Sequence, residues 1–144
     1  MSSPASEPPT APAPRLVFEI RLPPGVAAPS TRDAASRDVV ELQTSKNTMP
    51  ALLSEPRNDG AREILSGTVE LYYRTRQRLL VLHLPDKTDV LFELSLGLSP
   101  AHTKGFTDWR RADYVARPGD ERARPTASGD AWEIRYRIAW AGED

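Results

Sequence analysis

The sequence predicts an all-β protein, and more narrowly an antiparallel β-sandwich of about seven to eight short strands with Greek-key or jelly-roll-like connections. Two observations support this prediction. Several segments alternate apolar and polar residues with a period of two, which is the period of a half-buried strand. Turn-forming prolines, glycines and aspartates separate these segments, and no window has the 3.6-residue period of an amphipathic helix.

The prolines divide the chain into a leader and a body. The chain has 144 residues and 14 prolines, eight of which precede residue 30. Residues 1–14 are almost entirely Pro, Ala, Ser and Thr, so they bury too little apolar surface to offset the entropy lost on ordering. We therefore expect a disordered, proline-rich leader at 1–14, one β-sandwich domain at 15–140 and a tail at 141–144.

Alternation and turn residues place the strands of the body. The last strand is the clearest, because its large apolar side chains all fall on alternate positions from Trp132 to Trp140. The predicted strands are 15–22, 37–44, 63–74, 79–84, 90–96, 109–115 and 132–140.

The segments between the strands are expected to be turns and loops. Residues 48–55 predict either one helical turn or a wide loop, with Thr48 as a possible cap and Pro50 in the first turn. Residues 23–36 and 97–130 predict long connections of the Greek-key kind. The three segments within 70–96 are expected to follow one another as a three-stranded meander.

Composition removes several classes of function. Without cysteine there is no disulfide, no thiolate nucleophile and no cysteine-bound metal. Two histidines and a net charge of -1 argue against a histidine-rich metal site and against a strongly basic nucleic-acid binder. No apolar run approaches the roughly 20 residues of a membrane span, and no basic and apolar signal segment opens the chain, which favours the cytoplasm. We expect no cofactor.

A first candidate surface is the connection before the strand at 79–84. Arginines and tyrosines cluster there, and these residue types bind anions and dominate protein interfaces. A nearly neutral chain gives no long-range attraction to nucleic acid, so an acidic protein partner is the preferred interpretation. The residues assigned to this surface are Tyr72, Arg74, Arg76 and Arg78.

A second candidate site lies in the connection before 109–115. Aromatic rings beside planar hydrogen-bonding groups can stack on a sugar or anchor a protein contact. The residues assigned to this site are Phe106, Asp108, Trp109, Arg110 and Arg111. The alternative interpretation is that Phe106 and Trp109 close the open end of the sandwich.

The two histidines allow only a weak case for chemistry. His83 lies inside an apolar strand, where a neutral ring that is packed or hydrogen-bonded in the sheet is the simplest interpretation. His102 with Asp108 is a possible general base for a small hydrolase or isomerase, although no nucleophile accompanies them.

Together these features predict a non-enzymatic β-sandwich that binds another protein. The alternatives are a small-ligand or carbohydrate-binding module that uses the Phe106–Trp109 loop and, less well supported, an enzyme that uses His102. Association of identical chains through exposed strand edges is also possible.

Overall fold

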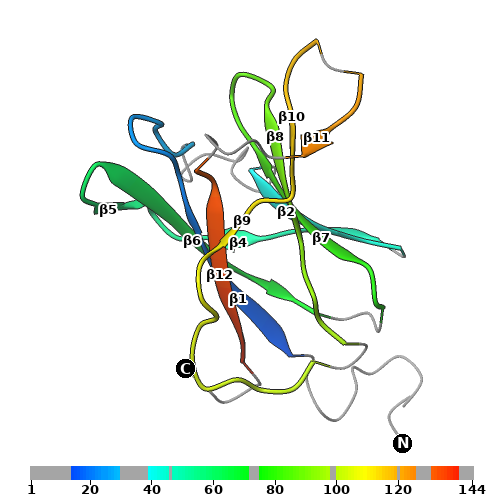
Figure 1. Cartoon of the computed structure of the whole chain (residues 1–144). Coiled ribbons are helices and arrows are strands. Elements are labelled where there is room, and N and C mark those ends of the chain that lie inside the picture. The colour runs from blue at the N-terminus through cyan, green and yellow to red at the C-terminus, as the bar shows by residue number, and fades with distance from the viewer. Residues whose placement is uncertain are drawn as a thin grey trace, which may run out of the picture.

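The computed structural model describes residues 14–29, 39–45, 47–71, 75–97, 100–119, 121–125 and 131–139. Within these residues the regular elements are twelve β-strands, and the strand pairs are antiparallel. The strands form two sheets that face each other, as Figure 1 shows. One apolar core lies between the two sheets. The predicted all-β antiparallel sandwich is therefore confirmed. The described residues form no helix that is long and apolar enough to cross a membrane.

Sheet A contains the two longest predicted strands, and it has the order β4-β6-β1-β12-β9 with β5 also paired to β6. Its strands are β1 (Arg15–Arg21), β4 (Leu52–Leu53), β5 (Arg57–Asp59), β6 (Arg62–Glu70), β9 (Arg110–Arg111) and β12 (Glu133–Ala139).

Sheet B has the order β11-β10-β8-β7-β2-β3, so the apolar strand β7 lies in its middle, as its composition predicts. Its strands are β2 (Val40–Thr44), β3 (Thr48–Pro50), β7 (Arg78–His83), β8 (Asp89–Glu93), β10 (Tyr114–Ala116) and β11 (Arg124–Pro125).

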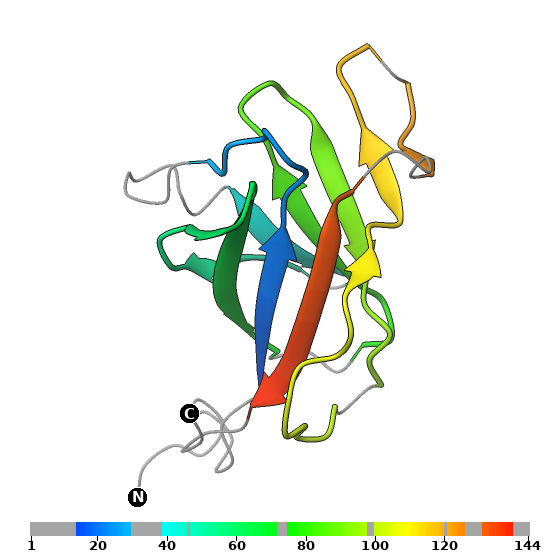
Figure 2. The same cartoon turned by 60° about the vertical axis from the view of Figure 1, so that its left-hand side comes forward.

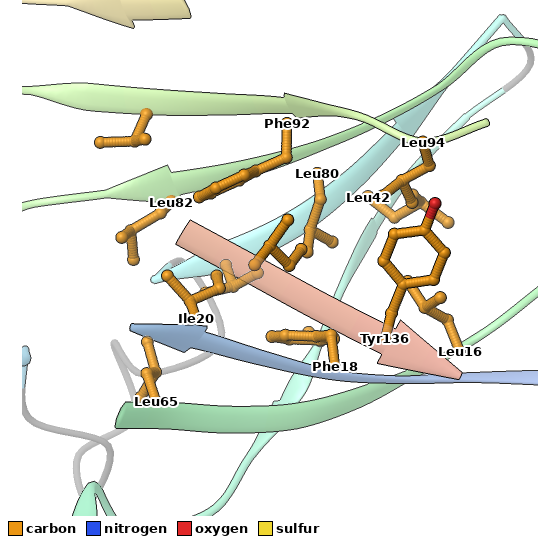
Figure 3. Close-up of a cluster of buried hydrophobic side chains, with 14 of the residues drawn as sticks. Leu16, Phe18, Ile20, Leu42, Leu65, Leu80, Leu82, Phe92, Leu94 and Tyr136 are labelled. Carbon is orange, nitrogen blue, oxygen red and sulfur yellow. The ribbon is translucent and has the colours of Figure 1, made fainter. Parts of the chain in front are cut away.

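The core lies between the inward faces of the two sheets. Strand β1 contributes Leu16, Phe18 and Ile20, which are completely buried, and Figure 3 shows them meeting side chains of β7 and β8. Strand β12 contributes Ile134, Tyr136 and Ile138 in the same way, and Trp132, directly before the strand, continues the pattern. The predicted alternation of both strands is therefore confirmed.

One glycine is required by the packing of sheet A. Gly67 of β6 lies opposite Phe18 of β1 in the strand register. A Cβ atom at Gly67 would lie 2.7 Å from the Phe18 Cζ, 2.7 Å from the Leu52 carbonyl oxygen and 2.7 Å from a methyl carbon of Leu53. The missing side chain is what lets the Phe18 ring and strand β4 approach the same point.

The chain passes from one sheet to the other at both edges of the sandwich. Between β3 of sheet B and β4 of sheet A there is a single residue, Ala51, which is buried and donates its N–H to the Val40 carbonyl. Between β9 of sheet A and β10 of sheet B, the N–H of Ala112 bonds to Trp132 and the N–H of Asp113 bonds to Leu91. These crossings tie the two sheets together covalently along their edges.

Three details of the sequence prediction are wrong. The predicted meander within 70–96 does not form, because β6 pairs with β1 in sheet A whereas β7 and β8 belong to sheet B. The predicted helical turn or loop at 48–55 contains the short strands β3 and β4 instead. The predicted strand at 109–115 is divided into β9 and β10, which lie in different sheets.

Parts of the predicted organisation lie outside the described residues. These are residues 1–13 of the leader, 30–36 of the first long loop, 37–38 and 72–74 of two predicted strands, 98–99, 120 and 126–130 of the second long loop, Trp140 and the tail at 141–144. The division into leader, domain and tail stays a prediction.

The Gly67 contact generates a stability prediction. Substitution Gly67→Ala should lower the free energy of unfolding by roughly 1–3 kcal/mol, because the added methyl group has to displace backbone or core atoms. Urea denaturation measures this change. The matched control is Gly97→Ala, since nothing lies within 4 Å of the methyl position there. Equal stability of the two variants would show that the sheet accepts a side chain at residue 67.

Candidate partner-binding surface

The connection that carries Phe106 and Trp109 lies along the edge of β12 opposite β1, where β9 pairs only with Glu133 and Ile134. The N–H of Thr107 donates to the Tyr136 carbonyl at 2.9 Å, and its hydroxyl oxygen accepts from the Tyr136 N–H at 3.2 Å. In the same way, the N–H of Thr103 donates to the Ile138 carbonyl at 3.1 Å, and the Thr103 hydroxyl oxygen accepts from the Ile138 N–H at 2.9 Å. Each threonine therefore satisfies both backbone groups of a β12 residue, as a paired strand would. Figure 2 shows this yellow segment beside the orange-red strand β12.

This placement brings two aromatic rings onto the outer face of sheet A. The Trp109 ring centroid lies 4.3 Å from Cζ of Arg21 and 4.7 Å from Cζ of Arg135. The Phe106 centroid lies 4.9 Å from Cζ of Arg135 and 5.8 Å from Cζ of Arg137. These distances are typical of cation–π contacts, which hold the rings and the guanidinium groups against one another. We refer to Arg21, Phe106, Trp109, Arg135 and Arg137 as the Arg–aromatic surface.

The two rings do not close the end of the sandwich. Neither belongs to the core cluster, and Phe106 is 36% exposed. The alternative interpretation of Phe106 and Trp109 as an apolar plug is therefore wrong. The contacts with arginine also occupy at least part of the Trp109 ring surface that a sugar would use. Carbohydrate binding at this loop stays a prediction.

The buried carboxylate of Glu19 and the partly buried carboxylate of Glu133 fix the arginines beneath the rings. Glu19, whose side chain is 11% exposed, accepts a 2.7 Å bond from Nε of Arg135 and forms a 2.8 Å ion pair with Arg57. Glu133 accepts from Nη2 of Arg21 at 2.8 Å. The Glu19 carboxylate needs such partners, because an unpaired buried charge is costly. These bonds fix the orientation of the guanidinium planes.

Arg137 differs from the other arginines of this surface. Among the described residues its side chain has no hydrogen bond or ion pair, and the ring contact with Phe106 is the sole electrostatic contact of its guanidinium there. It extends from β12 two residues beyond Arg135, on the same face. Its donors are therefore available to a ligand.

The remaining residues of the predicted site are divided between two places. Asp108 and Arg111 are exposed, and Arg111 lies opposite Glu133 in the register. Arg110 points toward sheet B, where Nη1 donates to the Glu93 carbonyl at 3.4 Å and Nη2 lies 3.8 Å from Asp113. Arg110 therefore covers the edge of the sandwich and does not belong to the Arg–aromatic surface.

The other predicted surface is only partly described. Tyr72 and Arg74 lie outside the described residues, and Arg76 is exposed. Arg78 is 4% exposed and donates from Nη1 to the Gly97 carbonyl at 2.7 Å, and burial lowers its pKa. The prediction of Arg78 as an exposed contact residue is therefore wrong, because its guanidinium is used inside the fold.

Arg76 and Arg78 line a depression of about 480 Å³, which lies where β2 and β8 end and β7 begins. Partner binding by Arg76 stays a prediction.

His102 and Asp108 lie on exposed positions and line neither this depression nor the one beside His83. Their proposed acid–base role also stays a prediction.

His83 lies on the outer face of sheet B between two carboxylates. Its Nδ1 is 2.7 Å from Oδ1 of Asp89, and its Nε2 is 2.6 Å from Oε1 of Glu41. Burial of the ring lowers its pKa, but the hydrogen bonds and negative charges of Asp89 and Glu41 raise the pKa by more, so the net shift is upward.

A protonated His83 donates from both nitrogens and leaves neither lone pair free for general-base chemistry. The expected hydrogen-bonded histidine is confirmed: the ring bridges β2 and β8, and its raised pKa favours the charged form over the expected neutral one. Lys87 also lines the shallow depression beside this bridge. In the part of the chain that the structure describes, no group of three or more His, Asp or Glu residues could hold a metal ion.

The sequence did not identify Arg21, Arg135 and Arg137 as site residues. Alternation placed Arg135 and Arg137 on the exposed side of β12, but no signal in the sequence showed that the 100–109 connection would return to cover that side.

No known protein family, curated protein or solved structure matches this chain.

The His83 bridge predicts a pH dependence of stability. A raised folded pKa means that the stabilisation is fully present below the unfolded value of about 6.5 and is lost as the pH rises through the folded pKa. Substitution His83→Gln should therefore lower the free energy of unfolding at about pH 5.5 more than at about pH 8.5, by on the order of 1 kcal/mol or less for a partly exposed pair.

Urea denaturation of both proteins at the two pH values measures the effect. The control is the double substitution Glu41→Gln and Asp89→Asn, which retains the ring and should remove most of the same pH dependence. An equal loss of stability at both pH values in His83→Gln would contradict the charged bridge.

Proposed function

We propose that this β-sandwich binds another protein through the Arg–aromatic surface and catalyses no reaction. The observation that carries the proposal is that Trp109 is held by guanidinium groups from two neighbouring strands, Arg21 of β1 and Arg135 of β12, while Phe106 beside it remains exposed. Tryptophan and arginine are the residues most enriched in the energetic centres of protein interfaces.

Preorganisation supports this choice of surface. Glu19 and Glu133 hold the arginines, and Thr103 and Thr107 hold the backbone of the aromatic segment. A surface whose side chains are already ordered loses little conformational entropy on binding. The exposed area of Phe106 then gives apolar contact, and the arginines give charged hydrogen bonds.

A cytoplasmic partner is expected, for the compositional reasons given above. The Arg76 surface is the alternative place of contact, and association of copies through strand edges is a further one. The outermost strands β3, β4, β9 and β11 are each only two or three residues long, which limits pairing through the edges.

The experiment is to capture partners from the host with the full-length chain, identify them, and measure the dissociation constant of the purified complex. Substitutions Trp109→Leu and Phe106→Ser should each weaken the complex by roughly 30-fold, the equivalent of about 2 kcal/mol for a central contact residue. Thermal unfolding of each variant checks that the sandwich is intact.

Two further variants locate the contact. Arg122→Gln removes an exposed arginine from the remote 121–125 segment and should leave the dissociation constant unchanged. Arg76→Gln tests the alternative surface. If Arg76→Gln weakens the complex while Trp109→Leu and Phe106→Ser do not, the contact belongs to the other surface and the proposal is wrong.

A further inference from the structure

We infer that the partner segment bound by the Arg–aromatic surface is an extended, acidic stretch of polypeptide, whose carboxylates pair with Arg137 and whose apolar side chain packs on Phe106. This inference rests on the proposed function and adds the chemistry of the partner. It follows from the one uncommitted guanidinium of that surface, the local charge and the spacing of the cationic side chains.

Arg137 is the anchor because it alone in the Arg–aromatic surface has no ion pair among the described residues. Arg21 and Arg135 already hold Glu133 and Glu19 at 2.8 and 2.7 Å. An arginine with all its donors free binds a carboxylate with two parallel hydrogen bonds. The neighbouring Phe106 ring limits the water that competes for these donors, which strengthens the pairing.

The local charge favours an acidic ligand, although the chain as a whole has a net charge of -1. Seven arginines and four carboxylates lie on the outer face of sheet A, by register, ion pairs and ring contacts. They are Arg15, Arg21, Arg57, Arg62, Arg111, Arg135 and Arg137, with Glu19, Asp59, Glu70 and Glu133. This face therefore carries a local positive excess, which is complementary to an acidic segment.

The spacing of the free cations fits an extended chain. Arg15 of β1 lies opposite Ala139, so it is the diagonal neighbour of Arg137 on the same face, about 7–8 Å away. Alternate side chains of an extended segment repeat about every 6.6–6.8 Å, which is close to that separation. Glu70 lies opposite Arg15 on β6 and offsets part of its charge, so Arg137 is the stronger of the two positions.

A nucleic acid is less well matched to this face. Four carboxylates lie among its arginines and would repel a continuous phosphate backbone, whereas a peptide can place its few acidic groups away from them. The experiment includes a nucleic acid so that this alternative has its own outcome.

The test uses the full chain and three probes of similar length: a synthetic peptide with glutamate at alternate positions, the same peptide with glutamine in their place, and a single-stranded oligonucleotide. Fluorescence anisotropy of the labelled probes gives the dissociation constants at about 50 mM and about 200 mM salt. The glutamate peptide should bind at least tenfold more tightly than the glutamine peptide, and more weakly at the higher salt concentration.

Variants assign the binding to Arg137. Substitution Arg137→Gln should weaken the glutamate peptide about tenfold, and Arg137→Lys should weaken it less, because the charge remains but the two-pronged geometry is lost. The matched control Arg122→Gln removes the same charge at a distance and should have no effect beyond about twofold.

Three results would overturn the inference: equal binding of the glutamate and glutamine peptides, equal affinities of Arg137→Gln and Arg122→Gln, or tighter binding of the oligonucleotide than of the glutamate peptide. These results are distinguishable from a failure of the proposed function. If Phe106→Ser releases the captured partner while the glutamate peptide does not bind, the surface is a protein contact but its partner is not an acidic segment.

Discussion

Strand β1 has both of its backbone edges and its inward face occupied by other parts of the chain. Its edges pair with β6 and β12 over all seven residues, and Phe18 lies over Gly67 with no space for a side chain there. Only its outward side chains remain available. The position and orientation of Glu19 and Arg21 are therefore set by the packing of the core, since a shift of one residue would exchange the buried and exposed faces.

The outer face of sheet A is arranged in consequence of this constraint. Because Glu19 is held at a poorly solvated position, it needs positive neighbours, and the register supplies Arg135 directly opposite on β12. Arg135 and Arg21 then provide the platform on which Trp109 lies. The aromatic segment is thus placed by a chain of contacts that begins in the core, and a surface with such support differs from an ordinary mobile loop.

The sequence predicted which faces are buried much better than which strands are neighbours. Alternation in β1 and β12 identifies the inward residues because burial acts on each strand separately. The alternation pattern does not show which strands pair along their backbone edges. It therefore predicts a hairpin of β6 and β7, although the chain changes sheets between them. The two-residue strands β4, β9 and β11 are too short to show any period.

The candidate site was predictable in its residue types and not in its assembly. The aromatic and basic residues from Phe106 to Arg111 stand out in the sequence, but the arginines that contact the rings come from β1 and β12. Arg78 shows the opposite error: its polar neighbours suggested an exposed tip, whereas its guanidinium is bound to the Gly97 carbonyl. Both errors arise from contacts between distant parts of the chain, which local patterns do not record.

The pairing of β1 with β12 also determines how this protein can acquire its structure. The first described strand has the last described strand as its neighbour, so sheet A is incomplete until almost the whole domain has left the ribosome. Topologies dominated by such distant pairings fold slowly, because the entropy of closing a long loop is lost before the contacts form. During synthesis the apolar side chains of β1 therefore stay exposed to water until β12 is available. In that interval chaperones or other nascent chains can bind them.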